Sequence, residues 1–202
     1  DISYLSCVPN AVIMQPCDEN ELQDRLFTAI GSEGPAFIRY PRGTALGVVV
    51  SDTPSCLDIG KAEIIENGDL GAIWAVGDFL QEALLINQML FDEFQSKLTI
   101  VNAKFIKPLD TSLLSSHGNK FELIFTLEDG VLKGGLGAAI AVFLNDNNFS
   151  TKVKSFGWPD TFVPHGDSVS QLRKDYKLDR LSIFKEIKTT LLPTINTVNI
   201  LV

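Results

Sequence analysis

The sequence predicts an α/β fold in which a mostly parallel sheet carries helices on both faces. From residue 59 onward, short apolar runs alternate with longer segments whose apolar residues recur at helical spacing. Gly77 follows the run 72–76, and Glu128-Asp129-Gly130 follow the run 123–127. Such residues after an apolar run are typical of strands that end at one edge of a sheet. Helices of this length allow right-handed crossovers between parallel strands.

Residues 1–43 read as strand, helix, strand. The apolar run 11–14 suits a buried strand, and the run 36–40 suits a second strand that Pro41 ends. Between them Asp18 and Glu21 have the spacing of a capping box, and Leu22, Leu26, Phe27 and Ile30 follow at helical spacing up to Gly31. So short a unit cannot bury its own core, and we expect it to be an incomplete βαβ piece of a larger domain.

The later elements follow a connector at residues 44–58, which holds a weak strand signal at 48–50. We expect residues 59–65 to form a strand or a hairpin arm that turns at Asn67-Gly68-Asp69. The other expected strands are 72–76, 98–102, 123–127 and 152–156, and the expected helices are 79–94, 110–116, 138–144 and 180–191. These patterns divide the chain into residues 1–47, a linker at 48–58, a domain at 59–192 and a tail at 193–202.

Composition excludes several classes of function. The net charge of −8 argues against a nucleic-acid surface, and no apolar run reaches the length of a membrane span. Three cysteines without metal-like spacing and only two histidines offer no metal site. The first residues, Asp1 to Leu5, show no initiator methionine or signal pattern, so we expect the chain to be the later part of a longer protein.

The strongest binding candidate is Arg42. It follows Pro41, whose ring fixes the local backbone at the expected end of strand 36–40. A guanidinium held in this way can donate two parallel hydrogen bonds to a phosphate or a carboxylate. The alternative is an ordinary strand end, at which Arg39 and Arg42 pair with surface carboxylates.

The order of the motifs resembles the C-terminal portion of the 1-deoxy-D-xylulose-5-phosphate synthase family, which are thiamine-diphosphate-dependent, transketolase-like enzymes. The resemblance begins in the end of a pyrimidine-binding domain, at residues 1–5, 8–14, 16–21 and 39–43. It continues in a transketolase C-terminal-like domain, at residues 60–63, 101–110, 128–137 and 158–166. Each motif is weak alone, but the set is collinear. The chain departs from the family pattern at Thr44, at Glu128-Asp129-Gly130 and at Trp158.

The resemblance implies an enzyme that condenses pyruvate with glyceraldehyde 3-phosphate with loss of carbon dioxide, for isoprenoid, thiamine and pyridoxal biosynthesis. It implies thiamine diphosphate and Mg²⁺ as cofactors, a homodimer, and a cytoplasmic location, or a plastid in a plant-type source. Arg42 would bind the phosphate of glyceraldehyde 3-phosphate, and Arg39 would bind substrate or form a structural ion pair. No catalytic, cofactor-binding or metal-binding residue is expected in this fragment, which alone would be inactive and serve dimerisation.

Other readings stay open. The chain also resembles the β subunit of a 2-oxoacid dehydrogenase E1 component, which shares this kind of C-terminal domain, and a flavodoxin-like binding protein is a more distant alternative. Glu128 and Asp129 stand where open α/β sheets bind ligands, or they serve subunit packing. The glycine-rich loop 134–137 would cradle an anion or allow close helix packing. We expect His117 at a solvent-exposed helix end and His165 in a structural hydrogen bond.

Overall fold

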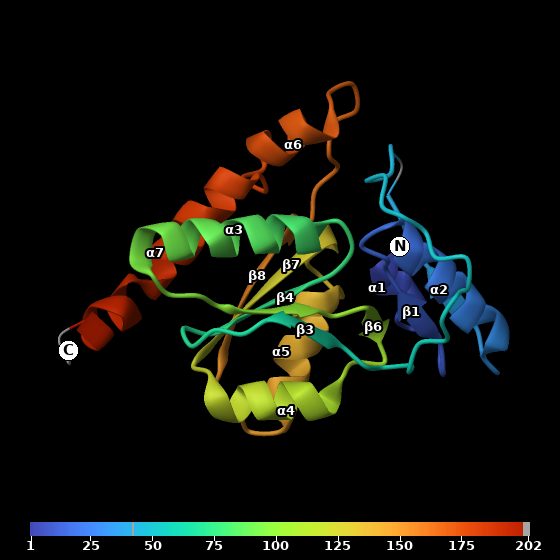
Figure 1. Ribbon diagram of the computed structural model, residues 1–202, viewed down its shortest axis with the longest axis horizontal. Coiled ribbons are helices and arrows are strands. Elements are labelled where there is room, and N and C mark those ends of the chain that lie inside the picture. Colours follow the sequence, from blue (N-terminus) through green and yellow to red (C-terminus); the bar gives the residue numbers. More distant parts are fainter. Residues whose placement is uncertain (42, 200–202) are drawn as a thin grey trace.

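The computed structural model describes residues 1–41 and 43–199, with side chains described as far as Pro193. Figure 1 shows a large sheet between two layers of helices, and beside it a smaller unit formed mainly by the N-terminal residues. The two sheets are separate, with the strand orders β2-β1-β6 and β3-β5-β4-β7-β8.

The large sheet confirms the predicted fold class. β4 pairs in parallel with both β5 and β7, and β7 pairs in parallel with β8, whereas the edge strand β3 runs antiparallel to β5. Residues 59–66 are therefore not the arm of a hairpin with the next strand along the chain. The strands are β3 (Glu63–Glu66), β4 (Ala72–Ala75), β5 (Thr99–Asn102), β7 (Leu123–Val131) and β8 (Lys152–Trp158).

Helices cover both faces of this sheet (Figure 1). Helices α3 (Phe79–Phe94) and α7 (Arg180–Asn199) pack on one face, and α4 (Thr111–Lys120) and α5 (Leu136–Asp146) pack on the other. A short helix that the sequence did not predict, α6 (Val169–Asp175), precedes α7. Helix α7 continues past residue 192 into the expected tail, of which residues 200–202 lie outside the described part of the chain.

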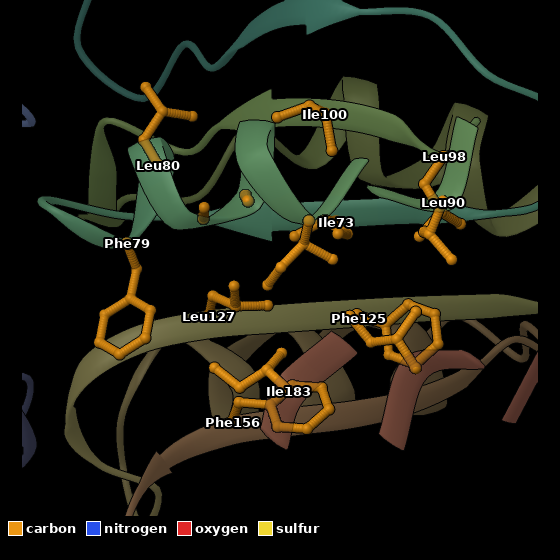
Figure 2. Close-up of a cluster of buried hydrophobic side chains, with 14 of the residues drawn as sticks. Ile73, Phe79, Leu80, Leu90, Leu98, Ile100, Phe125, Leu127, Phe156 and Ile183 are labelled. Atoms are coloured by element: carbon orange, nitrogen blue, oxygen red, sulfur yellow. The ribbon is translucent and has the colours of Figure 1, made fainter. Parts of the chain in front are cut away.

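Strand periodicity explains why the central strands are apolar throughout. Successive side chains of a strand point to opposite faces, so a sheet covered on both sides buries every position. In β4, Ile73 belongs to the cluster under α3 and α7, whereas Trp74 belongs to the cluster over α4 and α5. Figure 2 shows the first cluster, to which the sheet contributes Ile73, Phe125 and Phe156 and the helices contribute Leu90 and Ile183.

The N-terminal unit takes one of its strands from the rest of the chain. It consists of α1 (Ile2–Leu5), β1 (Val12–Met14), α2 (Glu19–Gly31) and β2 (Ala36–Ile38), and β1 pairs in parallel with β2. The third strand, β6 (Phe105–Lys107), pairs antiparallel with β1. Three residues give too short an apolar pattern to be recognised in the sequence, so β6 was missed.

Helix α2 turns polar residues inward. Asp24, Arg25 and Thr28 are buried, while Leu26, Phe27 and Ile30 are exposed. The buried polar groups hold the connector, because Ser55 N–H donates to Asp24 Oδ1 at 2.7 Å and Leu57 N–H donates to Thr28 Oγ1 at 2.9 Å. The connector forms no strand at residues 48–50, contrary to the weak signal there.

The expectation that His117 is exposed was wrong. Its helix, α4, turns this residue against β4, where Trp74 Nε1 donates a hydrogen bond to His117 Nδ1 at 3.1 Å. Burial, with a smaller contribution from the charge of Lys120, lowers the pKa of His117 to about 4. His117 is therefore neutral in the folded protein at pH 7, and its Nδ1 remains an acceptor for Trp74.

This burial predicts a pH dependence of stability. The pKa of His117 is lower in the folded chain than in the unfolded chain. The contribution of neutral His117 to the free energy of unfolding is therefore complete above about pH 6.5 and is lost as the pH falls toward 4. Between pH 7.5 and pH 4.5, we expect the wild type to lose about 2 kcal/mol more unfolding free energy than His117→Gln, as measured by urea denaturation. The matched control is His165→Gln, because His165 is exposed. Equal losses in wild type and His117→Gln would contradict the prediction.

Candidate functional site

Arg42, the main candidate from the sequence, lies outside the described residues. The residues that lead to it are described. Met14 of β1 pairs with Ile38 of β2, and the Arg39 N–H donates to the Met14 carbonyl at 2.9 Å. This is the last ladder hydrogen bond before Pro41, which has no N–H to donate. Phosphate binding by Arg42 therefore stays a prediction.

Arg39 reaches the large sheet. Its guanidinium Nη2 lies 3.0 Å from Asp129 Oδ2 near the end of β7. The other oxygen of Asp129 accepts a hydrogen bond from Trp158 Nε1 at 2.7 Å, so both carboxylate oxygens are used. The structural ion pair expected as one alternative for Arg39 is thus formed, while direct contact of Arg39 with substrate stays a prediction.

A second arginine stands behind this pair. Arg173 of α6 forms an ion pair with Asp78 and lies 3.7 Å from Asp129 Oδ1. Its guanidinium also stacks over the Phe79 ring, at 4.4 Å from the centroid. Arginines and aspartates thus alternate along a row of four side chains: Arg39 after β2, Asp129 of β7, Arg173 of α6 and Asp78 at the start of α3. No sequence pattern pointed to Arg173, because α6 is short and was not predicted.

Glu128, the neighbour of Asp129, serves the other face of the sheet. It is fully buried and accepts hydrogen bonds from the N–H groups of Leu136 and Gly137, at 2.8 and 2.9 Å. A Cβ at Gly135 would lie 2.0 Å from Glu128 Oε2, which explains the glycine there. Burial raises the pKa of Glu128, although these two N–H groups oppose the shift. The glycine-rich loop thus surrounds a carboxylate of the chain itself.

Ordinary ligand sites of open α/β sheets lie at the carboxyl edge of the strands, where the strand order reverses. Here the reversal occurs at β4, which is followed by β5 on one side and β7 on the other. The N-terminal unit fills this edge. Gln15 is fully buried against Gly77, where a Cβ would lie 2.2 Å from Gln15 Nε2. Arg39 lies at the end of β7, where it forms its ion pair with Asp129.

Glu21 forms the third contact at this edge. Its carboxylate accepts from Asn102 Nδ2 at 2.6 Å, at the end of β5, and from the Cys17 N–H at 2.8 Å. It also pairs with the fully buried Arg25 at 2.8 Å. Burial alone would raise the pKa of Glu21, but Arg25 and the bonds from Cys17 outweigh it and lower the pKa. Burial and the nearby Glu21 raise the pKa of the Cys17 thiol, so Cys17 is not a nucleophile here.

One pocket, of about 380 Å³, lies beside the Arg39–Asp129 pair. Its walls are mainly apolar and include Ile2, Trp158, Val163 and Leu172. Arg39 Nη1 is buried and has no hydrogen-bond partner among the described residues. His165, expected to make a structural hydrogen bond, is exposed in the nearby loop and makes none with the residues that the structure describes.

The described residues do not fit thiamine diphosphate. The carboxyl edge is filled by the chain, and residues 1–41 and 43–199 contain no group of three His, Cys, Asp or Glu side chains that could hold a metal ion. Helix α5 points its first N–H groups at Glu128 and not at an open cavity. In the same described part of the chain, no helix is both long and apolar enough to cross a bilayer.

The chain thus contains an α/β domain whose large sheet carries the N-terminal unit on its carboxyl edge. Comparison with known families gives the class: residues 60–183 match the model of the transketolase C-terminal domain, and the chain belongs to this family. A solved structure described as a split gene transketolase, inactive beta4 tetramer, superposes with a TM-score of 0.79 at 24% identity. The superposition covers 95% of this chain and 61% of the other, and at this identity it supports the fold alone.

Curated relatives are more similar in sequence. The 1-deoxy-D-xylulose-5-phosphate synthase of Acidobacterium capsulatum is 44% identical over 176 residues, which are 87% of this chain and 28% of the relative. The enzymes of the same name from Halothermothrix orenii and Syntrophus aciditrophicus are 40% and 41% identical over 92% and 94% of this chain, and 29% of each relative is covered. The chain thus spans less than a third of the length of these relatives.

The contacts of Glu21 predict how firmly the N-terminal unit is docked. In Glu21→Gln the charge that balances the buried Arg25 is lost, and we expect the unit to lose about 3 kcal/mol of local stability. Amide hydrogen exchange should become at least tenfold faster in β1 and β2 and stay unchanged in β4 and β7. Glu186→Gln, which removes an exposed ion pair with Lys154, is the control. Uniform acceleration across the chain would contradict local undocking.

Proposed function

We propose that this chain is the C-terminal part of a 1-deoxy-D-xylulose-5-phosphate synthase. The complete enzyme would be a transferase that condenses pyruvate with glyceraldehyde 3-phosphate with loss of carbon dioxide, at the start of isoprenoid, thiamine and pyridoxal biosynthesis. The observation that carries this proposal is the 37–44% identity to enzymes of that name over most of the chain.

The domain organisation follows from this proposal. Residues 1–47 would end a pyrimidine-binding domain, residues 48–58 would be the linker, and residues 59–192 would form the C-terminal domain, followed by the tail 193–202. The exposed edge of β2 and the exposed Leu26, Phe27 and Ile30 of α2 support a further layer on the N-terminal unit.

Arg42 would bind the phosphate of glyceraldehyde 3-phosphate, with Arg39 next to the site. Thiamine diphosphate, held with Mg²⁺ by groups outside this chain, supplies the decarboxylation and carbon–carbon bond chemistry. This chain would contribute recognition of the acceptor and the surface for a homodimer. The enzyme would act in the cytoplasm, or in the plastid for a plant-type source.

A second candidate is the β subunit of a 2-oxoacid dehydrogenase E1 component, or another transketolase-like protein. The match of residues 60–183 to the transketolase C-terminal domain supports it, because this second candidate shares that kind of domain. The two candidates differ in the acceptor. A synthase requires a triose phosphate, whereas an E1 component passes its acyl group to a lipoyl partner, so product analysis with glyceraldehyde 3-phosphate distinguishes them.

The proposal predicts that residues 1–202 alone are inactive. No described group forms a diphosphate or metal site, so isothermal calorimetry with thiamine diphosphate and Mg²⁺ should show no binding at micromolar concentrations. Pyruvate turnover should also be absent. Micromolar cofactor binding by this chain would contradict the assignment of the cofactor site to other parts of the enzyme.

Arg42→Ala in the complete enzyme tests the proposed site. Charge-assisted hydrogen bonds contribute roughly 1.5–3 kcal/mol each, so kcat/KM for glyceraldehyde 3-phosphate should fall by about tenfold to several hundredfold. The KM for pyruvate should change much less, and Arg42→Lys should recover only part of the loss because an ammonium lacks the planar fork.

The control for this variant is Arg180→Ala, since Arg180 pairs with Glu82 on α3, on the surface of the C-terminal domain. It should leave both substrates unaffected. Equal losses for pyruvate and glyceraldehyde 3-phosphate in Arg42→Ala, or a lower melting temperature alone, would make Arg42 structural and remove the proposed site.

A further inference from the structure

We propose that Arg173 of α6 is a standby counter-ion for Asp129, which takes over this carboxylate when Arg39 and the end of β2 move away from the large sheet. The end of β2 can then open without leaving a half-buried carboxylate unpaired. Asp78, at the start of α3, holds Arg173 back and so sets how firmly this end of the N-terminal unit is docked. The device depends on these four side chains and on none of the substrates proposed above.

The Asp129 carboxylate lies between two arginines from different parts of the chain. Arg39 Nη2 lies 3.0 Å from its Oδ2, and Arg173 Nη2 lies 3.7 Å from its Oδ1. Trp158 Nε1 also donates to Oδ1, at 2.7 Å, but the indole is neutral and cannot balance the charge. Only 14% of the Asp129 side chain is exposed, so a carboxylate without a cation is costly here.

Arg173 can replace Arg39 by a small movement. The same nitrogen of Arg173, Nη2, pairs with Asp78 Oδ2 and faces Asp129 Oδ1. A charge-assisted N–H···O bond is about 2.7–2.9 Å long, so a shift of about 1 Å would bring this nitrogen to Asp129. The guanidinium lies over the Phe79 ring, 4.4 Å from the centroid, and a contact of this kind persists to about 6 Å. The movement therefore keeps the contact with the ring.

Hydrogen bonding along this row of charges is incomplete. Arg173 Nε, Asp78 Oδ1 and Arg39 Nη1 are buried and have no hydrogen-bond partner among the described residues. A network in which every donor and acceptor is paired resists rearrangement, because each broken bond has to be replaced. Here two donors and one acceptor are free, so an exchange of partners breaks few bonds.

The two arginines therefore compete for Asp129. When β2 is docked, both positive charges face the same carboxylate and repel each other, whereas only Arg173 remains there when the end of β2 opens. Removing Arg173 should strengthen the docking of β2, and releasing it from Asp78 should weaken the docking. A merely structural ion pair predicts the opposite result for Arg173, because its loss would loosen the elements around it.

Amide hydrogen exchange of residues 1–202 measures this docking directly. The Arg39 N–H donates to the Met14 carbonyl at 2.9 Å, and this bond breaks when the end of β2 opens. The readout is the exchange rate of this N–H divided by the rate of the β4 amides in the same sample. A change in global stability then cancels, and only the opening of β2 against the large sheet is measured.

Two substitutions should change this ratio in opposite directions. In Arg173→Met, which keeps a long side chain on α6, we expect the ratio to fall about fivefold. In Asp78→Asn, which keeps the shape of the side chain but frees Arg173 to pair with Asp129, we expect it to rise about fivefold. In an Asp129→Asn background neither substitution should have a further effect, because both act through this carboxylate.

The matched control is Lys188→Met, which removes an ion pair between α7 and Glu93, near the other end of α3. Its ratio should stay within about twofold of the wild type. A higher ratio in both Arg173→Met and Asp78→Asn would show that the ion pairs are merely structural and would overturn the proposal. An unchanged ratio in Arg173→Met would overturn it as well, because the two arginines would then not compete.

Discussion

The arrangement depends on the docking of residues 1–40 onto the carboxyl edge of the large sheet. Gln15 packs against Gly77 after β4, while Glu21 and Arg39 make polar contacts with Asn102 at the end of β5 and with Asp129 near the end of β7. This edge is where α/β sheets of this topology ordinarily bind ligands. Because the chain itself covers the ends of these strands, the large sheet acts as a platform for the N-terminal unit.

Buried charge makes the docking specific. Arg25 is fully buried, the Glu21 side chain is 16% exposed, and the Glu21 carboxylate joins Arg25 to Asn102. A buried ion pair adds little net stability compared with apolar residues, but an incomplete pair costs several kcal/mol. Any displacement of α2 along the sheet would break the pair's bonds, so the penalty favours one register of docking. A second ion pair joins the two units in the same manner, because the half-buried guanidinium of Arg39 pairs with Asp129 of the large sheet.

The sequence was sufficient for the elements with long, regular patterns. Helix α3 was predicted with its bounds, because its sixteen residues carry an apolar stripe at helical spacing between the strands expected at 72–76 and 98–102. Asp18 caps α2 as its spacing to Glu21 predicted, and Asp110 caps α4 at the expected helix start; they accept from the N–H groups of Glu21 and Leu113. The elements that were missed, α1, β6 and α6, are short and owe their conformation to tertiary contacts. The inward polar face of α2 and the burial of His117 likewise depend on partners distant in sequence.

The residues of the candidate site, too, could be predicted from the sequence only in part. Arg42 and Arg39 were visible because a proline and two arginines at a strand end are a local signal. Asp129 was noted only for its place at the end of a strand, and its pairing with Arg39 joins residues 90 positions apart, which no local pattern encodes. The C-terminal domain meets the end of β2 through Asp129, whose other carboxylate oxygen accepts a hydrogen bond from Trp158, so this strand end is ordered by residues that only the folded chain brings together.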